Sequence, residues 1–178
     1  MASVGIKGAG IDLMEMSDHD LYFDQPLPES MKKLIEQAAS LYHRPESEFM
    51  LLGAYMIQPH HPVVHVALYR YYYYKHRLAE ALMIAERTLE DSGISLGFLG
   101  HWSEATLARL KASESNMAMV RYYLLALKGS GFICLRMGRR DEGLMRLKKV
   151  IEMDSEDRLG ARAILKVVEN AEAEACEA

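Results

Sequence analysis

Residues 62–95 read PVVHVALYRYYYYKHRLAEALMIAERTLEDSGIS, and this stretch decides the expected fold. Proline is well tolerated in the first turn of a helix, so Pro62 can open a helix that continues through the tyrosines. After a short turn at His76 and Arg77, apolar residues recur at three- and four-residue steps, as along one face of an amphipathic helix. These residues are Leu78, Ala81, Leu82, Ala85 and Leu89. The stretch therefore predicts two helices joined by a tight turn, over about 62–90.

Similar patterns lie on both sides of this pair. Residues 29–58, divided by Pro45, predict a second helical hairpin. Residues 114–154, divided by Gly138, predict a third, because a glycine just past the last turn commonly ends a helix. We therefore expect an all-α fold in which residues 26–178 form a single domain of stacked antiparallel hairpins.

The remaining segments are expected to play other parts. Residues 91–112 carry three glycines and predict an insertion, with Leu107 and Leu110 of a short helix facing inward. Residues 155–175 predict a capping helix, since the last helix of a stacked array needs a polar outer face. Residues 1–25 are rich in glycine and acidic residues, and we expect them to be a flexible acidic arm.

Composition excludes several classes of protein. The 178 residues are 50% apolar and 26% charged, as in an ordinary globular protein, and the formal net charge of -4 predicts no binding to nucleic acid or anionic membranes. Cys134 lies in an apolar helical run and Cys176 in an acidic tail, so no structural disulfide is expected. We find no apolar run of about 18 residues and no signal-peptide pattern. We expect a cytoplasmic location.

Two segments resemble tetratricopeptide repeats, which are paired helices with large and small residues at fixed positions. The segments are residues 62–95 and 124–157. The resemblance implies a right-handed stack of hairpins whose concave surface holds a protein partner. The matching positions are Leu68, Tyr72, Ala81 and Leu89 in the first segment, and Gly131, Gly138, Gly143, Val150 and Ile151 in the second.

The chain also departs from the repeat pattern. Tyr69 occupies a normally small site, His76 replaces the turn glycine, and Gly143 stands where alanine is usual. Gly93 and Ser155 replace the proline that usually ends a repeat. The two segments are 62 residues apart, so the array is interrupted.

The stretch HPVVHVALYRYYYYKHRLAEAL, residues 61–82, is similar to a group of bacterial tetratricopeptide proteins associated with nitrogen fixation. That group includes a nitrogenase-associated factor that binds the molybdenum–iron protein. The similarity implies an accessory role, with a nitrogenase component or its assembly intermediate as the partner.

The repeat pattern also implies which side chains line the concave face. Four consecutive tyrosines must point around most of a helix, so some are core and others exposed. We expect Tyr72 inside its own hairpin and Tyr71 against the preceding one. The alternative, in which the tyrosines only fill space between helices, stays open. The predicted partner-binding residues are Val63, Val66, Arg70, Tyr73, Tyr74, Lys128, Phe132, Leu135 and Arg136, with Leu125 as the equivalent of Val63.

Three histidines raise the question of a metal site. His61 and His65 lie one helical turn apart, with His60 beside them, but zinc normally takes four ligands, or three and water. We favour His61 as a helix cap and His65 as a half-buried residue, and we expect no metal.

A basic cluster and the single tryptophan each allow two interpretations. Basic residues gather around the last tight turn and could dock an acidic surface, although a solvated helix face is the favoured explanation. Trp102 is expected to fasten the insertion to the core, with an exposed anchor as the alternative. The basic residues are Arg136, Arg139, Arg140, Arg146, Lys148 and Lys149.

No catalytic motif is present: the sequence has no phosphate-binding glycine loop, G-x-S-x-G or H-E-x-x-H. We therefore expect a non-enzymatic protein without cofactors, an accessory or assembly factor that binds a larger protein. Two alternatives remain. One is a chaperone of the type III secretion kind that holds an extended client, and the other is a structural homodimer whose exposed aromatic residues meet their own copies.

Overall fold

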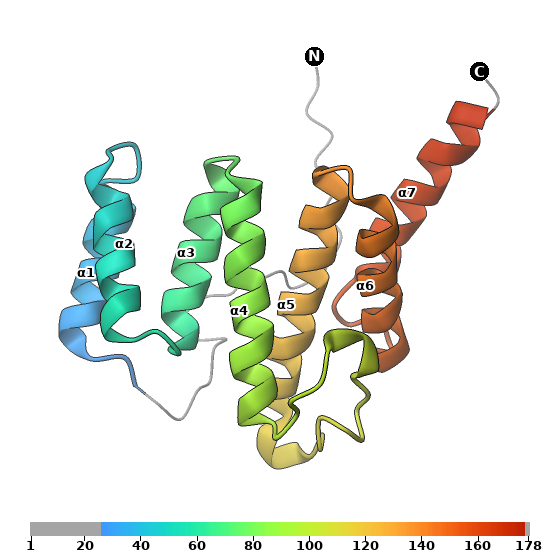
Figure 1. Ribbon diagram of the computed structural model, residues 1–178, viewed down its shortest axis with the longest axis horizontal. Helices are drawn as coiled ribbons and strands as arrows, with labels where there is room; N and C mark the ends of the chain where they lie inside the picture. The colour runs from blue at the N-terminus through green and yellow to red at the C-terminus, as the bar shows by residue number, and fades with distance from the viewer. Residues whose placement is uncertain (1–25, 177–178) are drawn as a thin grey trace.

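The computed structural model describes residues 26–176, which form seven α-helices and contain no strand. The fold is therefore all-α, as predicted. Successive helices run antiparallel and stand side by side, from α1 and α2 at one end to α7 at the other (Figure 1). The predicted acidic arm, residues 1–25, lies outside the described part of the chain. The helices are α1 (Glu29–Ser40), α2 (Glu46–Ile57), α3 (Pro62–Tyr74), α4 (Leu78–Ser95), α5 (Met117–Arg136), α6 (Arg140–Met153) and α7 (Ala161–Cys176).

The turns that join α3 to α4 and α5 to α6 have the same construction. Each contains one residue in the left-handed region, His76 with φ 58° and Gly138 with φ 77°. Because this conformation favours glycine, His76 occupies a strained position that the repeat pattern reserves for glycine. The next amide in each turn donates to a carbonyl five residues earlier, from Arg77 to Tyr72 and from Arg139 to Cys134, both at 2.9 Å. The two pairs are thus built alike at a spacing of 62 residues.

The second helix of each pair carries a small buried residue. Ala81 is fully buried, and Gly143 is buried at the crossing of α6 with α5. A Cβ added to Gly143 would lie 2.8 Å from the carbonyl oxygen of Gly131 and 2.8 Å from Cγ of Leu135. Real Cβ atoms do not approach this closely, so the separation of α5 and α6 depends on the absence of a side chain here.

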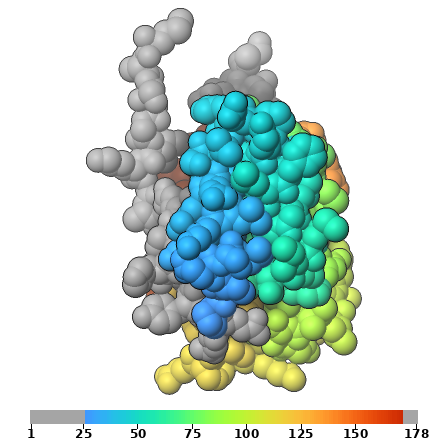
Figure 2. Space-filling model, turned by 90° about the vertical axis from the view of Figure 1, so that its left-hand side faces the viewer, coloured from blue at the N-terminus to red at the C-terminus, as the bar shows by residue number. Residues whose placement is uncertain are grey.

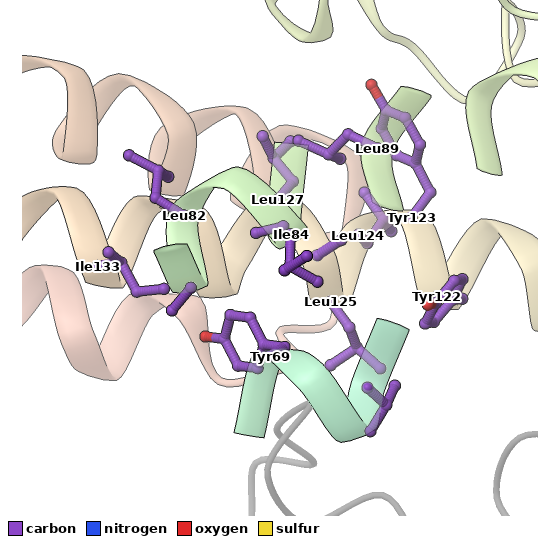
Figure 3. Packing of buried hydrophobic residues seen from close by; sticks show 14 of the residues in the cluster. Tyr69, Leu82, Ile84, Leu89, Tyr122, Tyr123, Leu124, Leu125, Leu127 and Ile133 are labelled. Atoms are coloured by element: carbon purple, nitrogen blue, oxygen red, sulfur yellow. The ribbon is translucent and has the colours of Figure 1, made fainter. Parts of the chain in front are cut away.

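Helix α5 lies at the centre of the core. Tyr69 of α3, Leu82 of α4 and Leu125 of α5 belong to one cluster of buried hydrophobic residues, part of which is drawn in Figure 3. The segment Glu114–Arg136 is long and apolar enough to cross a membrane by length and composition, so the expectation that no run reaches this length was wrong. However, 72% of its apolar window is buried inside the structure, as in the core helix of a globular protein.

The tyrosine run divides between core and surface. Tyr71 is buried and its ring meets the ring of Tyr42, which follows α1, with centroids 5.8 Å apart. It therefore faces the preceding hairpin, as predicted. Tyr72 is also buried, but its hydroxyl donates to Glu48 of α2 at 3.1 Å, so it too reaches the preceding pair. Arg77 donates to the same carboxylate at 2.6 Å and fixes α2 to the α3–α4 turn.

Two predicted segments differ from the structure. Helix α4 continues to Ser95, five residues into the expected insertion, and residues 102–112 form the 3-10 helix Trp102–Glu104, a turn and loops instead of an α-helix. Leu110 is fully buried, but Leu107 is 41% exposed, so the inward position predicted for Leu107 was wrong. The last helix begins at Ala161 and not at residue 155. The Asp154 carboxylate accepts the amides of Arg158 and Leu159 and so holds this segment in a turn.

Arg146 of α6 joins the insertion to three helices. Its side chain is only 4% exposed, and its guanidinium donates to Glu86 of α4, Glu142 of α6 and Ser130 of α5. Trp102 of the insertion packs on the guanidinium at 4.8 Å and is itself buried. Trp102 therefore fastens the insertion to the core. Arg146 is not part of a solvated basic face, contrary to the favoured prediction for this residue.

Candidate protein-binding face

All predicted binding residues lie on α3 and α5, but three of them are not accessible. Val66 and Leu125 are part of the core. Lys128 is 5% exposed, and its ammonium donates to the carbonyl of Leu159 at 2.8 Å, so it holds the α6–α7 connection in place. These three residues are removed from the candidate face. The spacing of a lysine along a helix does not show whether its side chain will be buried against a carbonyl group from a distant part of the chain.

Tyr73, Tyr74, Phe132 and Arg136 form an aromatic ridge, in which Tyr74 and Arg136 are exposed and Tyr73 and Phe132 are half-buried. The rings of Tyr73 and Phe132 lie 6.3 Å apart and join α3 to α5. The Arg136 guanidinium lies 5.3 Å from the Tyr73 ring, a cation–π distance. Tyr74 is 53% exposed and packs edge-on against Tyr73. Each side chain of the ridge therefore contacts at least one other.

A groove of about 190 Å³ runs beside the ridge, between α1 and α3. Arg70 and Tyr74 line it from α3. The other wall comes from α1, which the prediction did not include in the face. Ala38 and Ala39 are the signal available in the sequence, because small side chains on α1 leave room beside α3. The groove is lined by Ile35, Ala38, Ala39, Tyr42, Ser47, Leu51, Ala67, Arg70, Tyr71 and Tyr74.

The charged side chain among the described residues that line the groove is basic. Arg70 lines the groove, and the Lys75 ammonium lies 4.5 Å from the centroid of the Tyr42 ring at its edge. Arg136 adds a third cation on the ridge. No aspartate or glutamate is among the described residues that line the groove. The face is therefore suited to a partner that presents apolar side chains together with carboxylates.

A second concave region lies where α3 begins and α4 ends. This cleft of about 550 Å³ is lined in part by His60, His65, Arg87 and Asp91. The Asp91 carboxylate lies 3.1 Å from Nδ1 of His60, 3.2 Å from Nε of Arg87 and 3.7 Å from Nε2 of His65. The sequence did not predict that Asp91 would join the histidines, because it lies a whole helix away.

The histidines are used in hydrogen bonds. His61 caps α3, and its ring accepts the amide of Val63 at 3.3 Å, as favoured from the sequence. His65 is buried, and its Nε2–H donates to the carbonyl of Pro59 at 2.7 Å, so this nitrogen is not open to a metal. Among residues 26–176, no group of three potential ligands is placed to hold a metal ion.

His65 should make stability depend on pH. Burial lowers the pKa of His65 below 6.5, although the Pro59 carbonyl and Asp91 act in the opposite direction. The unfolded chain therefore binds a proton near pH 6.5 that the folded chain resists. The stability that the folded chain gains from keeping His65 neutral is complete above pH 6.5. It is lost as the pH falls from there toward the pKa of His65 in the folded chain. We expect the free energy of unfolding to fall between pH 7.5 and 5.5.

Urea denaturation at several pH values measures this effect. His65→Gln should flatten the slope, while His43→Gln, at an exposed site, should leave it unchanged. An unchanged slope in His65→Gln would assign the pH dependence to other groups.

Comparison with known proteins gives one informative relationship. No family model matches the chain, and no solved structure matches it. An uncharacterized 19.8 kDa protein of the nifW 5′ region of Azotobacter chroococcum mcd 1 is 41% identical over 165 residues, which are 92% of each protein. At this identity and coverage, the chain belongs to the same family as this Azotobacter protein.

Proposed function

We propose that the chain is a non-catalytic scaffold of the tetratricopeptide type that docks on a larger protein of nitrogen fixation in the cytoplasm. The observation that carries the proposal is the aromatic ridge and its neighbouring groove, a surface with aromatic side chains beside cations. Aromatic residues and arginine dominate the binding energy of protein interfaces.

The tetratricopeptide assignment is supported by the two similar helix pairs. Both pairs have the same turn hydrogen bonds and a left-handed residue at the same position, 62 residues apart. Both also have a small buried residue in the second helix, Ala81 in one and Gly143 in the other. Stacked pairs of this kind bury one another's apolar faces and leave one side free for a partner.

The contacts among the side chains of the face favour partner binding. Side chains that are already held in place lose little entropy when a partner arrives. Tyr73 is held by Phe132 and Arg136, and Tyr74 by Tyr73. The cations around the groove favour an acidic patch on the partner.

The nitrogen-fixation assignment has separate support. The relative from the nifW 5′ region is similar along nearly its whole length, so the similarity is not restricted to a generic helix pair. Together with the similarity of residues 61–82 to nitrogenase-associated factors, this favours a nitrogenase component as the partner. The molybdenum–iron protein is the first to test.

Calorimetric titration of the chain with purified molybdenum–iron protein tests the proposal. Arg70→Ala combined with Tyr74→Ala should weaken binding by about 30-fold or more, since two central contacts are removed. Helix content should not change, because Tyr74 is 53% exposed. A matched control is Met83→Ala with Met145→Ala, on exposed sites of α4 and α6, which should bind normally.

Three results would contradict the proposal. They are no binding to any nitrogenase component, equal binding by the Arg70/Tyr74 variant, and selective capture of an unfolded exported protein. The last would favour the secretion-chaperone alternative.

A further inference from the structure

Helix α2 carries an uncovered apolar stripe on its outer side. Phe49 is 74% exposed, Met56 83%, Ile57 61% and Leu52 37%. Their spacing places them on one face, while Ser47, Leu51 and Ala54 on the other face are buried. We call Phe49, Leu52, Gly53, Met56 and Ile57 the α2 stripe. No charged residue interrupts the sequence FMLLGAYMI from Phe49 to Ile57.

The exposed residues of the α2 stripe are not needed for packing within a single chain. Helices α1 and α2 form one end of the molecule, and both are open to the viewer in Figure 2. The exposed positions of α1 include Lys32, Lys33 and Glu36, the kind of polar surface expected at the end of a helical array. An apolar patch of several large side chains on a neighbouring helix therefore indicates an interaction site.

Gly53 provides a second, independent observation. It lies in the middle of α2, where glycine destabilises a helix relative to alanine. A Cβ added to Gly53 would meet nothing within 4 Å, so no contact inside the chain requires glycine. The crossing of Gly131 and Gly143 shows how this protein uses glycine where two helices approach closely. Gly53 is suited to the same use by a helix from outside the chain.

We propose that the helix covering the α2 stripe is α2 of a second copy, packed antiparallel across a two-fold axis near Gly53. A two-fold interface must be complementary to itself. The stripe meets this condition, because Gly53 lies at its centre and large apolar residues lie four positions before and after it, Phe49 and Ile57. In the antiparallel arrangement Gly53 faces its own copy, and Phe49 faces Ile57 of the second copy.

The helix dipoles and the apolar area of the α2 stripe both favour a second copy of α2 as the helix that covers it. Antiparallel packing places the N-terminal end of each α2 beside the C-terminal end of the other, so the helix dipoles attract. The four large side chains present roughly 500 Å² of apolar surface per copy, within the range of functional patches. Two such surfaces and their rims approach the area of a standard stable interface. This proposal uses α2 alone and is independent of the aromatic ridge.

Sedimentation equilibrium of the full chain tests the proposal. The wild-type protein should approach twice the chain mass of 20.2 kDa at micromolar concentrations. Met56→Glu should weaken dimerisation by about 30-fold or more, because it places a charge in the apolar contact. The control Met83→Glu, on the exposed surface of α4, should dimerise normally.

Gly53→Ala distinguishes a helix crossing from a general apolar contact. In the diluted monomer it should raise the melting temperature, since alanine favours the helix and its Cβ meets open space. At higher concentration the same variant should dimerise about tenfold more weakly or worse, because the added methyl groups separate the two helices. These opposite effects are not expected if Gly53 has only a structural role.

Disulfide trapping tests the antiparallel orientation in a Cys176→Ser background. A mixture of Phe49→Cys and Ile57→Cys chains should form a mixed disulfide-linked dimer, and neither variant should link efficiently to itself. The proposal would be overturned if the wild-type chain were still monomeric at about 100 μM. That concentration is on the order of the highest at which a specific dimer would be sought. Full dimerisation of both Met56→Glu and Gly53→Ala would also overturn it.

Discussion

Replacing Arg146 with methionine should lower the free energy of unfolding by about 3 kcal/mol, within the cost of removing one partner of a buried ion pair. Methionine keeps much of the aliphatic volume but removes the charge between the Glu86 and Glu142 carboxylates. It also removes the donor to the buried Ser130 hydroxyl and the cation on the Trp102 ring. The two carboxylates keep some contact with water, which places the expected loss near the lower end of the range.

The pH dependence of this loss identifies its cause. Burial alone would raise the pKa of Glu142, but the hydrogen bond and charge of Arg146 hold the pKa below its ordinary value of 4.5. The stability that Glu142 gains from Arg146 is therefore present above about pH 4.5 and is lost as pH falls through the folded pKa. The difference between wild type and Arg146→Met should be largest near pH 7 and should shrink in acid.

Chemical denaturation at pH 7 and at acidic pH measures the loss of unfolding free energy in Arg146→Met and its dependence on pH. The control is Lys149→Met on the same helix, whose ion pair with the exposed Glu152 should contribute no more than about 1 kcal/mol. A loss in Arg146→Met that is as small as the control, or independent of pH, would contradict a central ionic role for Arg146.

Arg146 also shows what could not be predicted from the sequence. It stands among several basic residues near a tight turn, a pattern that is typical of a solvated face. Its burial depends on Glu86, which lies 60 positions earlier, and on Trp102 in an irregular segment. Helical periodicity gives the face on which a residue lies, but not whether a distant carboxylate or carbonyl will meet it. Lys128, which donates to the carbonyl of Leu159, was placed on the surface for the same reason.

The helices themselves follow from local signals. Pro62 in a first turn and Gly138 just past a last turn mark ends that the structure also has. The insertion was predicted less well, because a buried residue such as Leu110 can be held by turns as well as by a helix. The α2 stripe could not be recognised from periodicity at all. Helix α2 is apolar on both sides, and only the structure separates the buried side from the exposed one.

Substitutions at Gly143, like those at Arg146, should strongly lower the free energy of unfolding. In tetratricopeptide repeats alanine is usual at this position, and alanine would favour the helix by about 1 kcal/mol. In this structure, however, a Cβ would lie 2.8 Å from the Gly131 carbonyl oxygen and from Cγ of Leu135. Overpacking costs typically about 1–3 kcal/mol, and here a backbone atom must move. We expect Gly143→Ala to be destabilising by about 1–2 kcal/mol, and Gly143→Val by about 4 kcal/mol because a β-branched side chain cannot turn away.

Thermal and urea unfolding of three further variants separate steric conflict from helix propensity. Gly131→Ala faces the same crossing, but its nearest contacts would be 3.1–3.3 Å, so its loss should be smaller than that of Gly143→Ala. Met145→Ala and Met145→Val, at a 55% exposed site on the same helix, report propensity alone and should change stability by less than about 1 kcal/mol. If Gly143→Ala proved neutral or stabilising, α5 and α6 could separate without cost. Glycine would then be permitted at position 143 but not required for the close packing of α5 and α6.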